Sequence, residues 1–321
     1  MKKILTLGSV TADILVNTVD QFPAPGILQG IDNVKILPGG CAVNAAIDIK
    51  KLGGDIALSC LIGDDALGKM LLNYFKNIDL TCEGIVIDPT VETTVSIVLI
   101  NSFGERSFLY NPGSSAEFGI KHINIELIKK SDIIFVAGQM LLPSFEGDDL
   151  ADFFKQMKSL GKYTVMDTAW DKDGKWLSRI EKALPYTDLF MPSKEEAIIM
   201  SGQKDPEKIA DFFFEKGCGS VVIKLGSDGS LICEDKDNRF YQPIIKGTAI
   251  VDSTGAGDSY CSGFLFGLAR NWNFNKCAEF ASCVASCCIE KKGASEGILS
   301  FEKTLSRLGF TSEDEFLNIQ K

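Results

Sequence analysis

Short apolar segments alternate with helical segments through the second half of the chain, and this alternation restricts the fold more than any other feature. The candidate strands after Asp132 are residues 133–137, 163–166, 189–191 and 221–225. Each is apolar almost throughout, as expected for strands that are buried on both faces of a parallel sheet. The pattern predicts an α/β fold in which a doubly wound, mostly parallel sheet is covered by helices on both faces.

Two segments, at about residues 14–37 and 91–111, interrupt this alternation. Apolar and polar residues alternate in both, which is typical of strands with one solvated face. Residues 101–105 have the composition of a hairpin connection. We therefore expect one domain over residues 1–321, with the two segments forming a small antiparallel sheet inserted into it. The tail, residues 311–321, is expected to be helical and dispensable.

A glycine-rich turn, Gly255-Ala256-Gly257, precedes Asp258 and an apolar helical segment, residues 260–268. If the helix starts near Gly255, the N–H groups of this turn have no partners within the helix. They then lie at the positive end of the helix dipole, where a phosphate is stabilised. Asp258 falls on the first turn, where its carboxylate could accept a proton from a hydroxyl that attacks that phosphate. The spacing alone is equally consistent with a capped helix after an ordinary turn.

The composition limits both the chemistry and the partners. Lys and Arg total 33 against 43 Asp and Glu, and the formal net charge of −10 argues against nucleic-acid partners and anionic membranes. The single histidine, His122, precedes a predicted helix and is expected to be structural, so base catalysis points to carboxylates. No two of the ten cysteines are spaced as Cys-x-x-Cys, which disfavours zinc and suits free thiols. No signal-like segment or long apolar run is visible, so a cytoplasmic location without membrane attachment is expected.

Polar and glycine-rich turns mark two further candidate binding positions. Asp13 lies a few residues beyond the first predicted strand, and ligands of open α/β sheets bind beyond the carboxyl ends of strands. Gly39 and Gly40 precede a helical segment and allow close backbone approach, with Asn44 one turn inside that helix. Each of these features alone is a weak indication, because polar loops and helix starts are common.

Residues 63–70, Gly-Asp-Asp-Ala-Leu-Gly-Lys-Met, match the spacing of a phosphate-binding P-loop up to its lysine. A P-loop next requires Ser or Thr to bind magnesium, and Met70 cannot do so. Asp64 and Asp65 would also repel a phosphate. The segment is therefore predicted to be the capped start of a helix.

Residues 252–258, Asp-Ser-Thr-Gly-Ala-Gly-Asp, resemble the C-terminal signature of the ribokinase-like (PfkB) carbohydrate kinases, and residues 38–46 resemble their N-terminal signature. The resemblance covers nearly the whole chain and implies a ribokinase-like fold in which the small inserted sheet is a lid over the substrate. It assigns the catalytic base to Asp258 and an anion hole to Gly255, Ala256 and Gly257. It assigns substrate binding to Asp13, Gly39, Gly40 and Asn44.

Further positions match the family in part. Residues 191–197 resemble its Asn-x-x-Glu motif, which positions magnesium, with Ser193 in place of Asn and Glu196 retained. A capping box formed by Ser193 and Glu196 is a second interpretation, and both can hold together. Asp252 is a candidate ligand of a monovalent cation. The nucleotide-binding residues implied by the resemblance are Lys224, Gly226, Ser227, Gly229 and Gly293.

The resemblance implies an enzyme that transfers the γ-phosphoryl group of ATP to a hydroxymethyl group of a sugar or sugar-like substrate. Mg²⁺ is the expected cofactor, K⁺ is left open, and a homodimer formed through the lid is expected. The family's ribokinases carry Lys-Gly after the paired glycines, where this chain has Cys41 and Ala42, so the sugar is not identified. Two alternatives stay open: a nucleoside kinase of the same fold, which an aromatic lid residue would favour, and a non-catalytic sensor of sugar or nucleotide.

Overall fold

The computed structural model describes residues 1–318, in which nine strands form one large sheet. Residues 319–321, the end of the predicted domain and tail, lie outside the described residues. The strands follow one another across the sheet in the order β13 (Arg239–Gln242), β12 (Ser230–Cys233), β11 (Ser220–Lys224), β10 (Leu189–Phe190), β9 (Tyr163–Met166), β8 (Ile133–Ala137), β1 (Ile4–Gly8), β4 (Ile56–Gly63) and β5 (Thr81–Asp88). Only the pairings β11–β12 and β12–β13 are antiparallel, so the predicted mostly parallel sheet is confirmed.

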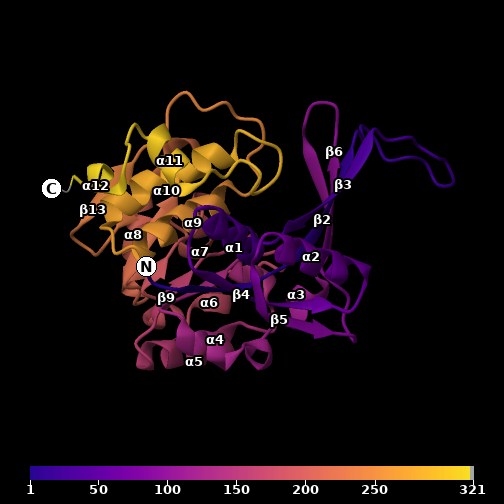
Figure 1. The fold of residues 1–321 in the computed structure, drawn as a ribbon. Coiled ribbons are helices and arrows are strands. Elements are labelled where there is room, and N and C mark those ends of the chain that lie inside the picture. The colour runs from indigo at the N-terminus through magenta and orange to yellow at the C-terminus, as the bar shows by residue number, and fades with distance from the viewer. Residues whose placement is uncertain (319–321) are drawn as a thin grey trace.

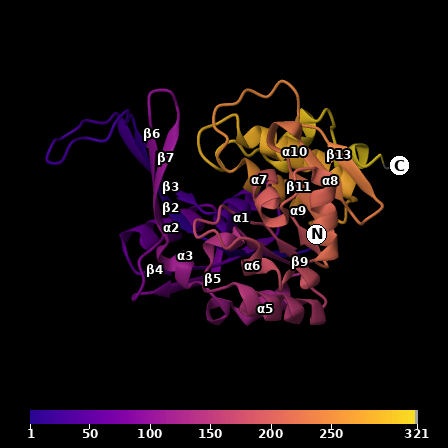
Figure 2. The same ribbon diagram turned by 180° about the vertical axis from the view of Figure 1, so that it is seen from behind.

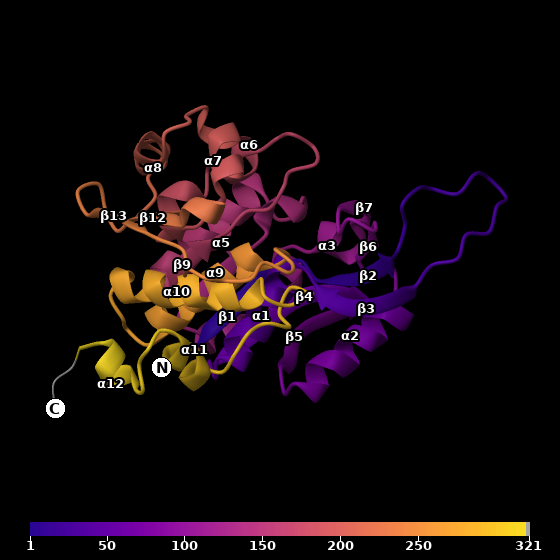
Figure 3. The same cartoon turned by 90° about the horizontal axis from the view of Figure 1, so that it is seen from above.

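Helices cover both faces of this sheet, as Figure 3 shows from above. The apolar core on one face contains buried side chains of α1 (Cys41–Lys51), α2 (Ala66–Asn77), α9 (Ala256–Ala269) and α10 (Phe274–Cys288). The core on the other face contains those of α5 (Gly147–Ser159), α7 (Lys194–Ser201) and α8 (Pro206–Glu215). The shorter helices are α3 (Gly113–Glu117), α4 (Ile125–Lys130), α6 (Leu177–Ile180), α11 (Phe301–Arg307) and α12 (Glu313–Phe316).

The two cores explain why the strands are apolar throughout. Successive side chains of a strand point to opposite faces of its sheet. In β11, Val221 and Ile223 enter one core and Val222 enters the other. A strand between two helical layers therefore needs an apolar residue at every position, which is the pattern that the sequence shows.

A second sheet has four strands in the order β3 (Asn33–Gly39), β2 (Thr11–Asn17), β6 (Val95–Ile100) and β7 (Arg106–Asn111). It is the predicted lid, and it projects from the body of the molecule (Figures 1 and 2). The prediction of a wholly antiparallel sheet is wrong in one pairing, because β2 and β6 run parallel. These strands come from the two separate segments, and the chain passes through the large sheet between them.

Several smaller features of the described part of the chain bear on the expectations. Asp65 caps α2 by accepting a hydrogen bond from the Gly68 N–H at 2.7 Å, as expected for a helix start rather than a P-loop. His122 is buried, and its Nδ1 accepts a hydrogen bond from the Gly119 N–H. All ten cysteines are free. Within residues 1–318, no helix combines the length and apolarity needed to cross a membrane.

The end of the described chain contradicts the expectation of a dispensable tail. Its helix α12 is short, and Phe316 is fully buried against Trp272 of the apolar core. Glu313 forms an ion pair with Arg270 and accepts a hydrogen bond from the Trp272 indole at 2.8 Å. Because an aromatic ring of this size contributes several kcal/mol when buried, this part of the tail stabilises the fold.

Candidate active site

The first turn of α9 forms the centre of the site. Gly255 is its N-cap, with a φ of 75° that favours glycine. A Cβ atom on Gly255 would lie 2.5 Å from the Ala294 carbonyl oxygen, so the close contact between these two loops also requires glycine. This glycine turn therefore fixes where α9 begins.

The backbone N–H groups of this turn are only partly used within the protein. The Ala256 N–H donates to the Ser253 carbonyl over 3.3 Å. The N–H groups of Gly255 and Gly257 have no hydrogen-bond partner among residues 1–318. Two of the three predicted anion-hole donors are thus available to a ligand, at the positive end of a 14-residue helix.

Asp258 lies in the same turn and contacts the second predicted motif. The Asn44 Nδ2 donates a hydrogen bond of 2.7 Å to Asp258 Oδ2. Asn44 is buried on the first turn of α1, whose N-cap Gly40 has a φ of 93°. The two glycine-led helix starts therefore meet at one carboxylate, as the family signatures imply.

The surroundings of Asp258 make its carboxylate more basic. Burial raises the pKa of Asp258 above its ordinary value, although the hydrogen bond from Asn44 and the charge of Lys224 oppose this shift. Burial and the negative charge of Asp258 together raise the pKa of Asp13 to about 7. The structure therefore brings together two carboxylates that the sequence places far apart.

Asp13 lies in a small cleft between the lid and the body of the molecule. A Cβ atom on Gly39 would lie 2.0 Å from Asp13 Oδ2, so the absence of a side chain at Gly39 makes room for the carboxylate. The cleft has a volume of about 60 Å³. Its lining includes Asp13, Ser96, Arg106 and Phe108 from the lid, and Asp252, Thr254, Gly293 and Ala294 from the body.

A second cavity, of about 340 Å³, surrounds the anion-hole turn. It contains the predicted Lys224, whose Nζ donates to Asp167 Oδ1 at 2.7 Å. A Cβ atom on Gly257 would lie 3.6 Å from Lys224 Nζ, so the ammonium group lies beside the anion hole. Asp167 was not among the predicted site residues; its position directly after β9, at the carboxyl end of a parallel strand, was the available signal.

Glu196 lines the same cavity and also caps a helix. Its Oε2 accepts hydrogen bonds from the Thr168 hydroxyl at 2.7 Å and from the Ser193 N–H at 3.0 Å. The predicted capping box is observed, with Ser193 as N-cap of α7. Residues 1–318 hold no cluster of three or more His, Cys, Asp or Glu that could bind a metal. A single carboxylate such as Glu196 fits Mg²⁺, which is usually held by one or two carboxylates together with water and phosphate oxygens.

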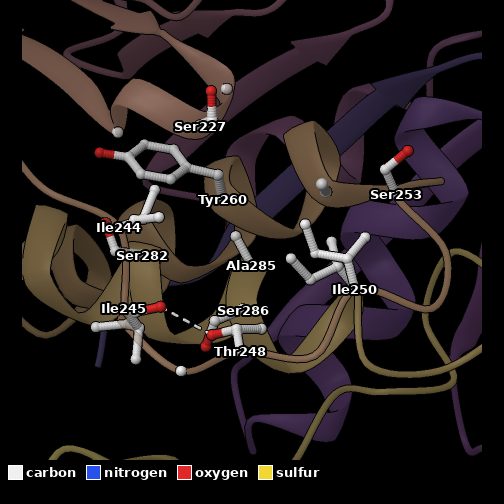
Figure 4. Close-up of a pocket in the computed structure, with 15 residues that line it drawn as sticks. Ser227, Ile244, Ile245, Thr248, Ile250, Ser253, Tyr260, Ser282, Ala285 and Ser286 are labelled. Carbon is white, nitrogen blue, oxygen red and sulfur yellow. Dashed lines mark hydrogen bonds between the residues drawn. The ribbon is translucent and has the colours of Figure 1, made fainter.

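An apolar pocket of about 340 Å³ adjoins this cavity (Figure 4). Three predicted nucleotide-binding residues, Gly226, Ser227 and Gly229, line it. Ala256, predicted for the anion hole, also lines it. The remaining lining was not predicted from the sequence, and it includes Ile244, Ile245, Ile250, Tyr260, Ala285 and Ile289. Figure 4 shows Tyr260 and Ala285 together with isoleucines of the loop before Ser253 around this pocket, and such a mostly apolar lining suits a planar heterocycle.

Two further predicted residues, Gly293 and Asp252, line the lid cleft. Gly293 does not line the apolar pocket; it lines the lid cleft, with a φ of 103°, and its N–H donates to Asp252 Oδ2 at 2.9 Å. Asp252 is buried and forms an ion pair with Arg106 of the lid. Its Oδ1 also accepts a hydrogen bond from the Thr254 N–H at 2.8 Å. Both oxygens of Asp252 are therefore occupied by groups of the protein itself.

The chain is similar to known kinases over nearly its whole length. The chain is 28% identical to the ribokinase of Haemophilus influenzae over 320 residues, which cover 96% of this chain and 99% of that enzyme. It is 26% identical to the nucleoside kinase of Methanocaldococcus jannaschii, with 96% and 97% of the two chains covered.

The structure of Arabidopsis thaliana ribokinase in complex with ribose and ATP superposes on this chain with a TM-score of 0.86. The alignment covers 96% of this chain and 99% of that one at 23% identity, which shows a common fold. The sequence profile of the pfkB family carbohydrate kinases matches residues 1–300. The predicted family, ribokinase-like fold and enzyme class are thereby confirmed: this chain belongs to the pfkB family and is an ATP-dependent carbohydrate kinase.

Proposed function

We propose that this kinase transfers the γ-phosphoryl group of ATP to a hydroxymethyl group of a sugar or sugar-like substrate, with Asp258 as the general base. The observation that carries the proposal is the position of Asp258, beside an N-terminal anion site and within hydrogen-bond distance of Asn44. A carboxylate with a raised pKa, next to phosphate-binding N–H groups, suits the removal of a proton from an attacking hydroxyl.

In the proposed reaction the substrate hydroxyl gives its proton to Asp258 as its oxygen bonds to the γ-phosphorus, and the bond to the β–γ bridging oxygen breaks. The Gly255 and Gly257 N–H groups stabilise the charge on the transferred group, with Ala256 between them and Lys224 alongside. Glu196, acting partly through water, would help hold Mg²⁺, and the bound ion would supply positive charge beside the phosphates. Every one of these groups lines one cavity.

The substrate would lie between Asp258 and the lid. Asp13 accepts hydrogen bonds from its hydroxyls, while Gly39 leaves room for that carboxylate and Gly40 begins the helix that carries Asn44. The Oδ1 atom of Asn44 is buried and has no hydrogen-bond partner within residues 1–318, so it is available to a substrate hydroxyl. An unpaired buried acceptor costs free energy that a ligand donor would recover.

The nucleotide would place its base in the apolar pocket of Figure 4, with Gly226, Ser227 and Gly229 beside it. Lys224 is better placed to contact the phosphates than the base, and Gly293 contributes through Asp252 rather than by touching adenine. A monovalent cation on Asp252 fits poorly, because Arg106 already pairs with this carboxylate.

A nucleoside substrate is the second candidate, and Phe108 is the observation that favours it. This lid residue lines the cleft with Asp13 and is 61% exposed, so its ring offers a face to a stacked base. A sugar without a base would leave much of that face in contact with water.

A second copy of this chain is the partner that we propose, bound through the outer face of the lid. Side chains alternate along each strand, and Asp13, Ser96, Arg106 and Phe108 face the cleft. The opposite face is apolar on all four strands, with Ile14, Val16, Val34, Ile36, Ile97, Leu99 and Leu109. A face of this kind is unfavourable in water and is typical of a protein interface. With a net charge of −10, we expect no nucleic-acid partner.

The test is ADP release from ATP and Mg²⁺ across a panel of ribose, fructose, 2-keto-3-deoxygluconate, fructose phosphates and nucleosides. Turnover with one free sugar or sugar acid supports the proposal, and turnover confined to nucleosides replaces it with the second candidate. Binding of ATP and sugars with no turnover of any compound would favour a sensor and contradict the proposed reaction.

A further inference from the structure

Arg106 crosses from the lid to the body of the molecule. It is the first residue of β7, next to the hairpin turn at residues 101–105. Its guanidinium forms an ion pair with Asp252, whose carboxylate is only 4% exposed. Burial alone would raise the pKa of Asp252, but the hydrogen bonds from Arg106, Gly293 and Thr254 hold it below its ordinary value. The carboxylate is thus charged and needs a cation beside it.

Asp252 in turn joins the segment that leads into the anion-hole turn to the loop that packs against this turn. It accepts hydrogen bonds from the N–H groups of Thr254 and Gly293, which belong to different segments of the chain. Thr254 precedes Gly255, and Ala294 packs so closely on Gly255 that a Cβ atom would collide with it. The charge balance at Asp252 therefore bears directly on where the Gly255 and Gly257 N–H groups point.

A monovalent cation at Asp252 would compete with Arg106 for the same carboxylate. Arg106 lies where such an ion would have to bind, and it also lines the cleft that contains Asp13. A guanidinium cannot be deprotonated at accessible pH and binds a carboxylate through directed N–H donors. It thus supplies a permanent positive charge from the lid.

We propose that Arg106 is a positioning residue that serves as the built-in cation of Asp252. It couples the closed position of the lid to the geometry of the anion hole and makes turnover independent of added monovalent cations. This inference rests on the proposed phosphoryl transfer, but its structural part concerns the loops alone.

The first experiment compares wild type, R106M and R106K in KCl and in choline chloride at equal ionic strength. For wild type we expect kcat/KM to differ less than about twofold between the salts. In choline chloride, the kcat/KM of R106M should be on the order of 10- to 100-fold below that of wild type, the equivalent of one hydrogen bond to a charged group. K⁺ should restore part of this loss, and R106K should lie between R106M and wild type. K35M, which removes a positive charge from exposed β3 in the same lid, is the matched control and should show no response to K⁺.

The second experiment needs no turnover. Amide hydrogen exchange of the peptides containing Thr254 and Gly293 should accelerate in R106M, and K⁺ should slow it again, while wild type and K35M stay insensitive to the salt. A lack of turnover with every substrate would contradict the proposed function and leave this readout intact. The inference is overturned if K⁺ activates wild type many-fold. It is equally overturned if folded R106M matches K35M in both exchange and cation response.

Discussion

The side-chain amide of Asn44 donates a hydrogen bond of 2.7 Å to the carboxylate of Asp258, across a sequence separation of 214 residues. This contact joins the two glycine-led helix starts, on α1 and α9, at one proton acceptor. It gives Asn44 two roles in the proposed reaction, since one side-chain atom orients the base and Oδ1 can receive a substrate hydroxyl.

Replacement of Asn44 should therefore change both the rate and its pH dependence. In N44A we expect kcat/KM to fall on the order of 10- to 100-fold, the equivalent of one hydrogen bond to a charged group. The Asn44 hydrogen bond lowers the pKa of Asp258, so its loss raises that pKa. The rising, acidic limb of the pH–rate profile should consequently move to higher pH. A variant that loses rate with an unshifted profile would show that Asn44 contributes only substrate binding.

The Gly255 turn should not tolerate a side chain. G255A places a Cβ atom 2.5 Å from the Ala294 carbonyl at a positive φ, so the anion-hole N–H groups must shift. A displacement of catalytic groups by about 1 Å can lower the reaction rate ~10²-fold, and we expect kcat to fall by this order. G26A is the matched control, because Gly26 has a similar φ of 80° and no atom within 4 Å of the added Cβ. Equal losses of kcat in the two variants would mean that backbone strain, rather than the contact with Ala294, limits the rate.

A buried carboxylate behind the site should make stability depend on pH. Burial raises the pKa of Asp48 to about 7, and its Oδ2 accepts a hydrogen bond from the Ser259 hydroxyl at 2.7 Å. Between about pH 4 and 7 the folded protein holds a proton at Asp48 that the unfolded chain has released, so this group stabilises the fold less as the pH rises.

D48N removes this titration. We expect it to raise the free energy of unfolding by about 2–3 kcal/mol more at pH 8 than at pH 5, measured by urea denaturation. D152N, at an exposed position of α5, should show no such difference between the two pH values. A D48N effect that is equal at both pH values would contradict the assigned ionisation.

The outer face of the lid should control the oligomeric state. I36E introduces a charge into the apolar face of β3, where a second copy is proposed to bind, and should convert a dimer to a monomer in sedimentation velocity. K35E changes the neighbouring residue, which points to the other face of the sheet, and should leave the dimer intact. A monomeric wild type at high micromolar concentration would rule out this interface.

The fold can be predicted well from the sequence because the two residue patterns that indicate it, one for the large sheet and one for the lid, are local. A strand buried between two helical layers is apolar at nearly every position, whereas a strand with one solvated face alternates apolar and polar residues. The residue pattern alone therefore distinguishes the large sheet from the lid. The parallel pairing of β2 with β6 is not encoded in this way, since it depends on how two distant segments come together. The packing of Phe316 on Trp272 is not predictable from the sequence for the same reason.

Of the candidate site, the sequence predicts the residues that lie in glycine-rich turns, because such turns have recognisable composition. Asp258, Asn44 and Asp13 converge as expected. Asp167 and Arg106 were missed, because a single charged residue at a strand end has no motif around it. The apolar wall of the nucleotide pocket was missed because isoleucines in a loop look like ordinary packing residues until the fold places them beside α9 and α10.

The central claim, that Asp258 removes the proton of the attacking hydroxyl, is tested most directly by single-turnover kinetics of D258N with MgATP and the best substrate from the panel. General bases contribute roughly 10²–10⁴-fold, and we expect a loss of the phosphoryl-transfer rate in this range with ATP affinity within about threefold of wild type. Phosphoryl transfer by D258N at the wild-type rate would contradict the claim, because an amide at this position cannot accept the proton.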